Sequence, residues 1–408
     1  MKVLLCHNHY QQPGGEDQVF ADEGRLLEAH GHQVLRYTLH NDALDGMSRI
    51  TAARKTLWNS QAASEIGALV RRERPEIAHF TNTFPLISPA AYYAARRGGA
   101  AVVQSLHNYR LLCTGAVFLR DGRVCEDCLG RRFAWPGVWH ACYHSSRAAT
   151  GVVAAMQTVH RMLGTWDRAV DRYIALTESA REKFLAGGLP ADRLSVKGNF
   201  VDSDPGLGTG DGGFALFVGR LSPEKGLDTL LSAWRHLPGR RLIIVGDGPL
   251  APQVQAAAAS NPHIEWLGRR SRAEALELLG WAACVIVPSL SYEMFGMVVI
   301  EAFARGAPVV ASCQGALAEL VEHERTGLHF TAGNPLELAQ AAGRLLADEA
   351  LRARLQHAAR AEYEQRHTAA DNHTRLVAIY REARRQYEGV ASEANEAAAR
   401  AAPQQVTS

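Results

Sequence analysis

The chain has 408 residues, of which 47% are hydrophobic and 21% charged, a composition typical of globular proteins. This length exceeds that of one ordinary hydrophobic core and predicts two domains. Residues 1–200 hold 24 Lys and Arg against 18 Asp and Glu, whereas the remainder holds 20 against 24. The mild asymmetry does not indicate nucleic-acid binding, but a basic front half suits anionic membranes or anionic substrates.

The sequence predicts neither a signal peptide nor a transmembrane helix. The opening MKVLLCHNHYQQPGGED has only a short apolar run and is typical of a first strand and loop. No run of 18 or more apolar residues follows. We therefore expect a cytoplasmic protein with reduced thiols, either free or held peripherally on the inner face of the cell membrane.

The first half predicts a domain over residues 1–201. Short apolar segments alternate with helical stretches, namely KVLLC, HQVLRYT, EIAHF, AAVVQSLH and RYIALT. This alternation is typical of a parallel sheet with helices on both faces. An insertion rich in Cys and Trp interrupts the domain at about residues 110–147. Residues 202–213, DSDPGLGTGDGG, have almost nothing to bury and predict a linker.

The second half repeats the alternation over residues 214–369. Its predicted strands are FALFVG, RLIIVG, HIEWLG, CVIVPS and APVVAS. Residues 370–388 predict a polar helix with apolar positions at Leu376, Ile379 and Tyr380. The Ala- and Gln-rich tail, residues 389–408, is expected to be disordered.

Two loops of the second domain follow predicted strands, where open α/β sheets bind ligands. In FVGRLSPEKG, Arg220 and Lys225 lie in a turn that precedes a helix. A helix N-terminus beside two cations suits a diphosphate, because its free N–H groups and the charges act together. The alternative is that both side chains are ordinary surface charges.

The stretch YEMFGMVVIE, residues 292–301, places Glu293 in a predicted loop and Glu301 in the following helix. Carboxylates accept hydrogen bonds from sugar and ribose hydroxyls. Gly296 allows a ligand to approach the backbone closely. The N–H groups that can hold a phosphate are those of Phe295, Gly296, Met297 and Val298. The alternative is two solvated carboxylates at the ends of a buried segment.

These motifs together resemble retaining glycosyltransferases of family 4. EMFGMVVIE matches the E-x7-E motif of that family, and GRLSPEKG, GDGP and EAFARGAPVVAS occur in the expected order. The match is strong through residues 214–330 and looser in the first half, at PGGED (Gly14, Gly15) and SLHNYR. The resemblance implies an α/β protein with the GT-B fold, in which two Rossmann-like domains face a central cleft.

The same resemblance implies roles for individual residues. Glu293 would contact the donor sugar and Glu301 the ribose, while Arg220 and Lys225 would hold the diphosphate. His107 of the front domain would reach the donor sugar near the reacting carbon, across the cleft from the other four residues. The family usually needs no bound metal, so no cofactor is expected besides a UDP- or GDP-sugar as substrate. Without the resemblance, His107 would be read as a packed or solvated side chain.

The insertion carries two further features. Cys113, Cys125, Cys128 and Cys142 include a C-x2-C pair, a spacing that suits a structural zinc; a disulfide or four reduced thiols are the alternatives. In FAWPGVWHACYH, aromatic side chains lie near basic ones, which suits a peripheral membrane contact or ordinary packing equally.

The main hypothesis is a retaining hexosyltransferase that moves a sugar from a nucleotide diphosphate to a hydroxyl group. The expected acceptor is a glycan or lipid-linked glycan of cell-surface polysaccharide or glycolipid synthesis. A GT-B nucleotide-sugar epimerase and a non-catalytic nucleotide-sugar-binding protein are the competing hypotheses.

Overall fold

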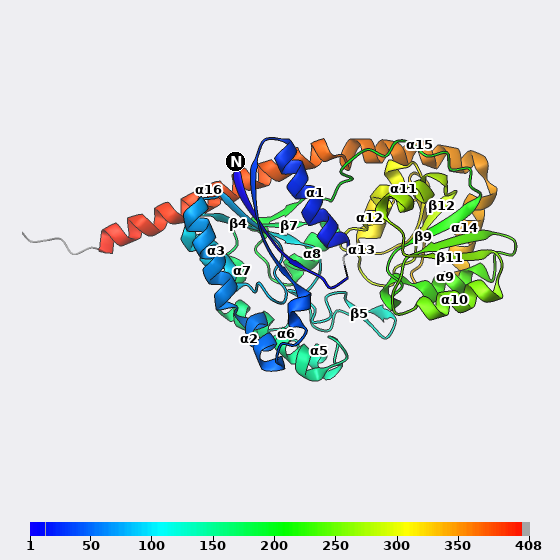
Figure 1. The fold of residues 1–408 in the computed structure, drawn as a ribbon. Coiled ribbons are helices and arrows are strands. Elements are labelled where there is room, and N and C mark those ends of the chain that lie inside the picture. Colours follow the sequence, from blue (N-terminus) through cyan, green and yellow to red (C-terminus); the bar gives the residue numbers. More distant parts are fainter. Residues whose placement is uncertain (13, 402–408) are drawn as a thin grey trace, which may run out of the picture.

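A computed structural model describes residues 1–12 and 14–401, with side chains through residue 390. The chain forms two α/β lobes side by side, and α16 runs from the second lobe back along the first (Figure 1). The α/β fold class with two Rossmann-like domains is confirmed, because each lobe contains a six-stranded parallel sheet.

The sheet of the first domain has the strand order β2-β1-β3-β4-β7-β8. Its strands are β1 (Lys2–His9), β2 (Gln33–His40), β3 (Ile77–Asn82), β4 (Ala101–Leu106), β7 (Arg172–Ala175) and β8 (Leu194–Val196). Strands β3 and β4 are buried along their whole length, since helices cover both faces of the sheet. The helices are α1 (Gly15–Ala29), α2 (Arg49–Leu57), α3 (Ser60–Glu73), α4 (Ala90–Gly98), α5 (Trp135–Trp139), α6 (Arg147–Met162), α7 (Thr165–Arg168) and α8 (Glu178–Ala186).

The second sheet has the order β11-β10-β9-β12-β13-β14. Its strands are β9 (Phe214–Val218), β10 (Arg241–Val245), β11 (Ile264–Gly268), β12 (Cys284–Val287), β13 (Val309–Ser312) and β14 (Gly327–Phe330). The helices are α9 (Leu227–Trp234), α10 (Ala251–Ser260), α11 (Arg272–Trp281), α12 (Met297–Ala304), α13 (Gly315–Leu320), α14 (Pro335–Ala347) and α15 (Glu349–Arg366). The order changes direction between β9 and β12, and such a switch point is where open α/β sheets bind ligands.

Helix α16 (Ala369–Ala401) connects the second domain to the sheet of the first. Its buried residues Leu376, Ile379 and Tyr380 pack with Val3 and Leu5 of β1. Helix α16 continues over residues 389–401, part of the range for which the sequence analysis expects a disordered tail. Alanine has the highest helix propensity, so the Ala-rich composition extends a helix that packing has already nucleated. Residues 402–408 lie outside the described residues.

Residues 202–213 contain neither helix nor strand, but they follow the surface of the second domain closely. The N–H groups of Gly208, Gly210 and Gly212 donate to the carbonyls of Arg305, Gly280 and Trp281. A Cβ on Gly208 would lie 2.2 Å from the Gly280 oxygen, so this close approach requires glycine. These bonds fix residues 208–212 to the second domain, whereas Asp202 accepts hydrogen bonds from Arg25 of the first domain.

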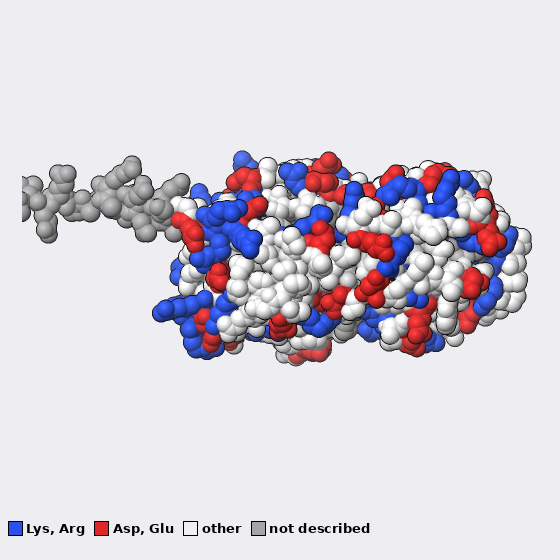
Figure 2. Space-filling view, turned by 90° about the horizontal axis from the view of Figure 1, so that it is seen from above, with Lys and Arg blue, Asp and Glu red and all other residues white. Residues whose placement is uncertain are grey.

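The described helices include none long and apolar enough to span a membrane. Basic and acidic side chains are interspersed on the face that Figure 2 presents.

Candidate active site

A cavity of about 560 Å³ opens between the two domains. Gly14, Asp17 and Gln18 line it from the start of α1, and residues 269–272 line it from the turn before α11 and its first residue. A Cβ on Gly15, the first residue of α1, would lie 3.7 Å from Met297 Cγ, so the start of α1 lies close to the start of α12. The packing of the two domains therefore brings the Gly14–Gly15 segment close to the YEMFGMVVIE segment.

Two loops of the second domain lie against each other. Gly226, with φ of +71°, follows the turn that contains Arg220 and Lys225, and a Cβ there would lie 1.9 Å from the Pro288 oxygen. Only glycine fits this contact, which fixes the Arg220–Lys225 turn against the loop that carries Glu293. The backbone thus explains why GRLSPEKG and PSLSYEMFG, some 70 residues apart, form one site.

Glu293 lies in the loop before α12, as predicted, and binds Lys225. Lys225 Nζ donates to Glu293 Oε1 over 2.6 Å, and the Ser289 hydroxyl donates to the same oxygen over 2.5 Å. Burial opposes ionisation of Glu293, but Lys225 and Ser289 outweigh it and hold the pKa of Glu293 below its ordinary value. Arg220 is exposed nearby, and its charge acts on Lys225. The site therefore presents a fixed carboxylate beside two cations.

Helix α12 begins immediately after Gly296, whose φ is +100°. The loop residue Phe295 packs its ring against Gly198 of the first domain, where a Cβ would lie 2.8 Å away. The first N–H groups of the helix, at Met297 and Val298, have no intrahelical partner by position and lie next to the Gly15 contact. They can therefore bind an anion in the cleft.

Glu301 lies in α12 and has different partners from Glu293. Arg272 Nε donates to Glu301 Oε1 over 3.2 Å, and Arg272 also donates to Asp22 of α1 over 2.9 Å. Burial raises the pKa of Glu301, against the opposing charge of Arg272. This Glu301–Arg272–Asp22 chain joins the domains at the wall of the cleft. The sequence analysis did not identify Arg272 or Asp22, since nothing local shows that residues 250 positions apart meet.

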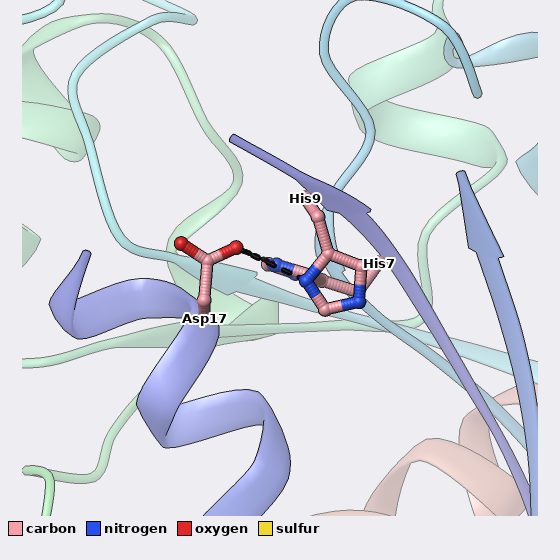
Figure 3. Close-up of side chains that lie close together, drawn as sticks. All are labelled: His7, His9 and Asp17. Carbon is pink, nitrogen blue, oxygen red and sulfur yellow. Dashed lines mark hydrogen bonds and ion pairs between the residues drawn. The ribbon is translucent and has the colours of Figure 1, made fainter. Parts of the chain in front are cut away.

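The first domain contributes a cluster of His7, His9 and Asp17 beside the glycine loop (Figure 3). His7 Nε2 and His9 Nδ1 lie 2.9 and 3.2 Å from Asp17 Oδ1. The N–H groups of Gly14 and Tyr10 also donate to the Asp17 carboxylate, over 2.8 and 3.3 Å. Burial opposes the charge of Asp17, but the bonds from His7 and Gly14 prevail and lower its pKa. Asp17 therefore holds the loop that reaches Met297.

His107 follows β4 and is partly buried. Burial lowers the pKa of His107 to about 3, so its imidazole is neutral at pH 7. Its enclosed Nε2 has no hydrogen-bond partner among the residues whose side chains are described. The nearest charges are the buried pair Glu23 and Lys197, whose Oε1 and Nζ lie 2.7 Å apart. His107 thus keeps one enclosed ring nitrogen without a partner among these side chains.

The four clustered cysteines of the insertion are all unpaired thiols in the structure. Cys113 is buried, and Cys125, Cys128 and Cys142 are partly buried. The insertion contacts the loop that carries Glu293, because the ring centroids of Phe118 and Tyr292 lie 6.2 Å apart. It therefore supports the loop that carries Glu293.

The two facing sheets and the charged cleft define a protein of the GT-B class. The chain matches the family model described as Glycosyltransferase Family 4 over residues 13–205, and that of Glycosyl transferases group 1 over residues 205–362. The chain belongs to glycosyltransferase family 4, and the predicted family is confirmed.

The matches to curated relatives cover only part of this chain and part of each relative. An uncharacterized glycosyltransferase of Methanocaldococcus jannaschii is 35% identical over 163 residues, which is 40% of this chain and 46% of the relative. A D-inositol 3-phosphate glycosyltransferase of Mycobacteroides abscessus is 36% identical over 181 residues, 42% of this chain and 39% of the relative. The chain thus matches less than half the length of these relatives.

Solved structures match over nearly the whole chain. Anabaena HepE in complex with UDP has a TM-score of 0.65 at 20% identity, covering 93% of this chain and 99% of HepE. Sucrose-phosphate synthase of Thermosynechococcus elongatus has a TM-score of 0.69 at 17% identity, covering 93% and 98%. At this identity, the likeness establishes the GT-B fold alone.

Proposed function

We propose that this protein is a retaining glycosyltransferase that moves a sugar from a UDP- or GDP-sugar to a hydroxyl of a glycan or glycolipid. The observation that carries the proposal is the Lys225–Glu293 pair, held at 2.6 Å beside the N-terminus of α12. The Lys225 ammonium suits the leaving diphosphate, and the Glu293 carboxylate suits the hydroxyls of the transferred sugar. The UDP and UDP-glucose complexes of HepE support the donor class.

In the proposed reaction, negative charge develops on the leaving diphosphate as its bond to the sugar breaks. Arg220, Lys225 and the N–H groups of Met297 and Val298 would stabilise that charge. Because the helix N–H groups and the bonded Lys225 are fixed before the reaction, they cost little reorganisation. The leaving phosphate oxygen would accept the proton of the acceptor hydroxyl, so that no second charged base is required. Neutral His107 would hydrogen-bond the sugar from the opposite domain.

A panel of UDP- and GDP-sugars, incubated with and without hydroxyl acceptors, tests this function. We expect nucleotide release that depends on an acceptor, and a product whose anomeric configuration matches the donor by NMR. A thermal-shift series identifies the base first, since a nucleotide at 100 times its Kd adds about 2.7 kcal/mol of stability. Sugar isomerisation without an acceptor would favour an epimerase, and binding without turnover a binding protein; either result would refute the proposal.

The exposed aromatic and basic side chains on one surface of the first domain favour an acceptor that is held in a membrane. Phe133, Trp135 and Trp139 are 44, 54 and 64% exposed. Arg131 and Arg147 lie over the rings of Trp135 and Trp139, at 5.4 and 5.1 Å. Exposed Val159, Met162 and Leu163 lie at the end of α6, which the Arg131–Arg132 loop contacts. Aromatic rings beside arginines suit the headgroup region of an anionic bilayer.

We expect the Trp135→Ala/Trp139→Ala protein to bind vesicles rich in anionic lipid at least about tenfold more weakly than the wild type, because each ring buries a large apolar area. Vesicle sedimentation measures this. Trp281→Ala is the matched control, since Trp281 is 48% exposed on the second domain. If both variants bind like the wild type, the surface has no role in membrane binding.

A further inference from the structure

The insertion after β4, at about residues 110–147, contains little regular secondary structure. It contains the two-residue strands β5 (Leu119–Arg120) and β6 (Arg123–Val124) and the five-residue helix α5. Nine non-glycine residues in the described chain have positive φ, and six of these lie between Cys113 and Arg147. They are Ala116, Phe118, Asp121, Ala141, His144 and Ser145. A segment with so few ladder hydrogen bonds needs another source of stability.

Close contacts bring three of the four cysteines of this insertion toward two glycines. A Cβ on Gly115 would lie 3.8 Å from Cys113 Sγ and 3.7 Å from Cys142 Cβ. A Cβ on Gly137 would lie 3.3 Å from Cys128 Sγ. The N–H of Cys142 donates to the Gly137 carbonyl over 3.0 Å, which joins the two contacts. Cysteines separated by up to 29 positions in the sequence therefore lie close together in the fold.

The fourth cysteine comes from the C-x2-C turn. The N–H of Cys125 donates to the Phe118 carbonyl over 2.8 Å, extending the β5–β6 hairpin. Gly130, two residues after Cys128, has φ of +72° and turns the chain away. The remaining cysteines of the protein lie elsewhere: Cys6 and Cys284 are single buried side chains in β-strands, and Cys313 is exposed.

The electrostatics of the four thiols agree with this placement. Burial, together with the neighbouring Cys113, Cys142 and Cys125, raises the pKa of Cys128 to about 11. A divalent cation at their centre reverses this effect, because thiolates bound to a metal ion are deprotonated.

We propose that Cys113, Cys125, Cys128 and Cys142 bind one structural Zn²⁺ through four thiolates. Binding releases the four thiol protons to solvent, with no oxidant or reductant required. The sulfurs must first turn inward: in the part of the chain that the structure describes, the one group of three potential ligands already within 4.8 Å is His7, His9 and Asp17. That group is the weaker candidate, because backbone N–H groups and both histidines already occupy its carboxylate.

The proposed zinc site would have a structural role, which does not depend on the proposed transfer reaction. Phe118 lies within the loop that Cys113 and Cys125 bracket, and its ring packs against Tyr292, the neighbour of Glu293. Glu126, inside the C-x2-C turn, binds Lys183 over 2.6 Å, and Lys183 lies 4.8 Å from the Tyr292 ring centroid. A zinc ion would therefore hold the insertion against the loop that carries Glu293, as structural zinc sites stabilise small loop-rich units.

Elemental analysis of the full-length protein, purified in zinc without chelator, tests the proposal. We expect about one zinc per wild-type chain, a loss of at least tenfold in Cys125→Ser/Cys128→Ser, and wild-type content in Cys313→Ser. Cobalt substitution of the wild type provides a second measurement that needs no variant: intense visible bands and a thiolate charge-transfer band report tetrahedral thiolate ligation.

Three results would overturn the proposal. A metal-free wild type with seven titratable thiols after denaturation would show that the cysteines are simply reduced, and five thiols would show a disulfide. Zinc that remains in Cys125→Ser/Cys128→Ser but disappears in Asp17→Asn would place the ion at the histidine cluster. If the double variant does not fold, the cobalt spectrum of the wild type decides.

Discussion

Lys225→Ala is expected to lower kcat by about 10²–10³, which corresponds to about 2.7–4 kcal/mol of lost transition-state stabilisation. The ammonium lies 2.6 Å from Glu293 beside the start of α12, where the diphosphate of the donor would leave. Its contribution grows as charge develops on that group, so kcat should fall more than KM rises. The melting temperature should fall only modestly: Lys225 is 30% exposed, but Glu293, which is 15% exposed, loses its counter-charge.

Steady-state kinetics and thermal melting of the same preparation check this prediction. Arg235→Ala is a suitable control, because Arg235 is an exposed cation at the end of α9, outside the cleft. The variant Lys225→Met removes the charge but keeps a side chain of similar length, so it separates the effect of the charge from the effect of side-chain volume. A Lys225→Ala enzyme with unchanged kcat would exclude Lys225 from the chemical step, and a large fall in melting temperature would give it a structural role instead.

Glu301→Ala should weaken the binding of the nucleotide by about 10- to 100-fold while leaving kcat at saturating donor within a few-fold of the wild type. Hydrogen bonds to a charged group contribute about 1.5–3 kcal/mol, and every 1.4 kcal/mol is tenfold in affinity. The proposed contact is to the ribose, which is present equally in ground and transition states, so its loss should affect binding rather than turnover.

Calorimetric titration with UDP and with GDP measures this effect. Glu277→Ala is the control, since Glu277 is exposed on α11. Arg272→Ala addresses a competing explanation: Arg272 binds both Glu301 and Asp22, so an effect that acts through domain alignment would appear in both variants. Unchanged nucleotide affinity in Glu301→Ala would remove Glu301 from the site.

The strands that the sequence predicted are mostly those with a continuous apolar run. KVLLC falls within β1, and AAVVQSLH and FALFVG match β4 and β9 to within one residue at each end, because strands covered on both faces need continuous apolar runs. The edge strands β8 and β14 escaped prediction, because their sequences LSV and GLHF contain no continuous apolar run. The extent of α16 beyond residue 388 could not be predicted, because composition alone does not show that this helix begins on a packed sheet.

By itself, the sequence determined the two α/β domains and the loops that carry Arg220, Lys225, Glu293 and Glu301, because strand-end turns, glycines and charges are local properties of the chain. Only the tertiary structure decided which of these groups meet. It paired Lys225 with Glu293 and placed Arg272 between Glu301 and Asp22, since contacts between residues 68 and 250 positions apart depend on how the sheets and domains pack.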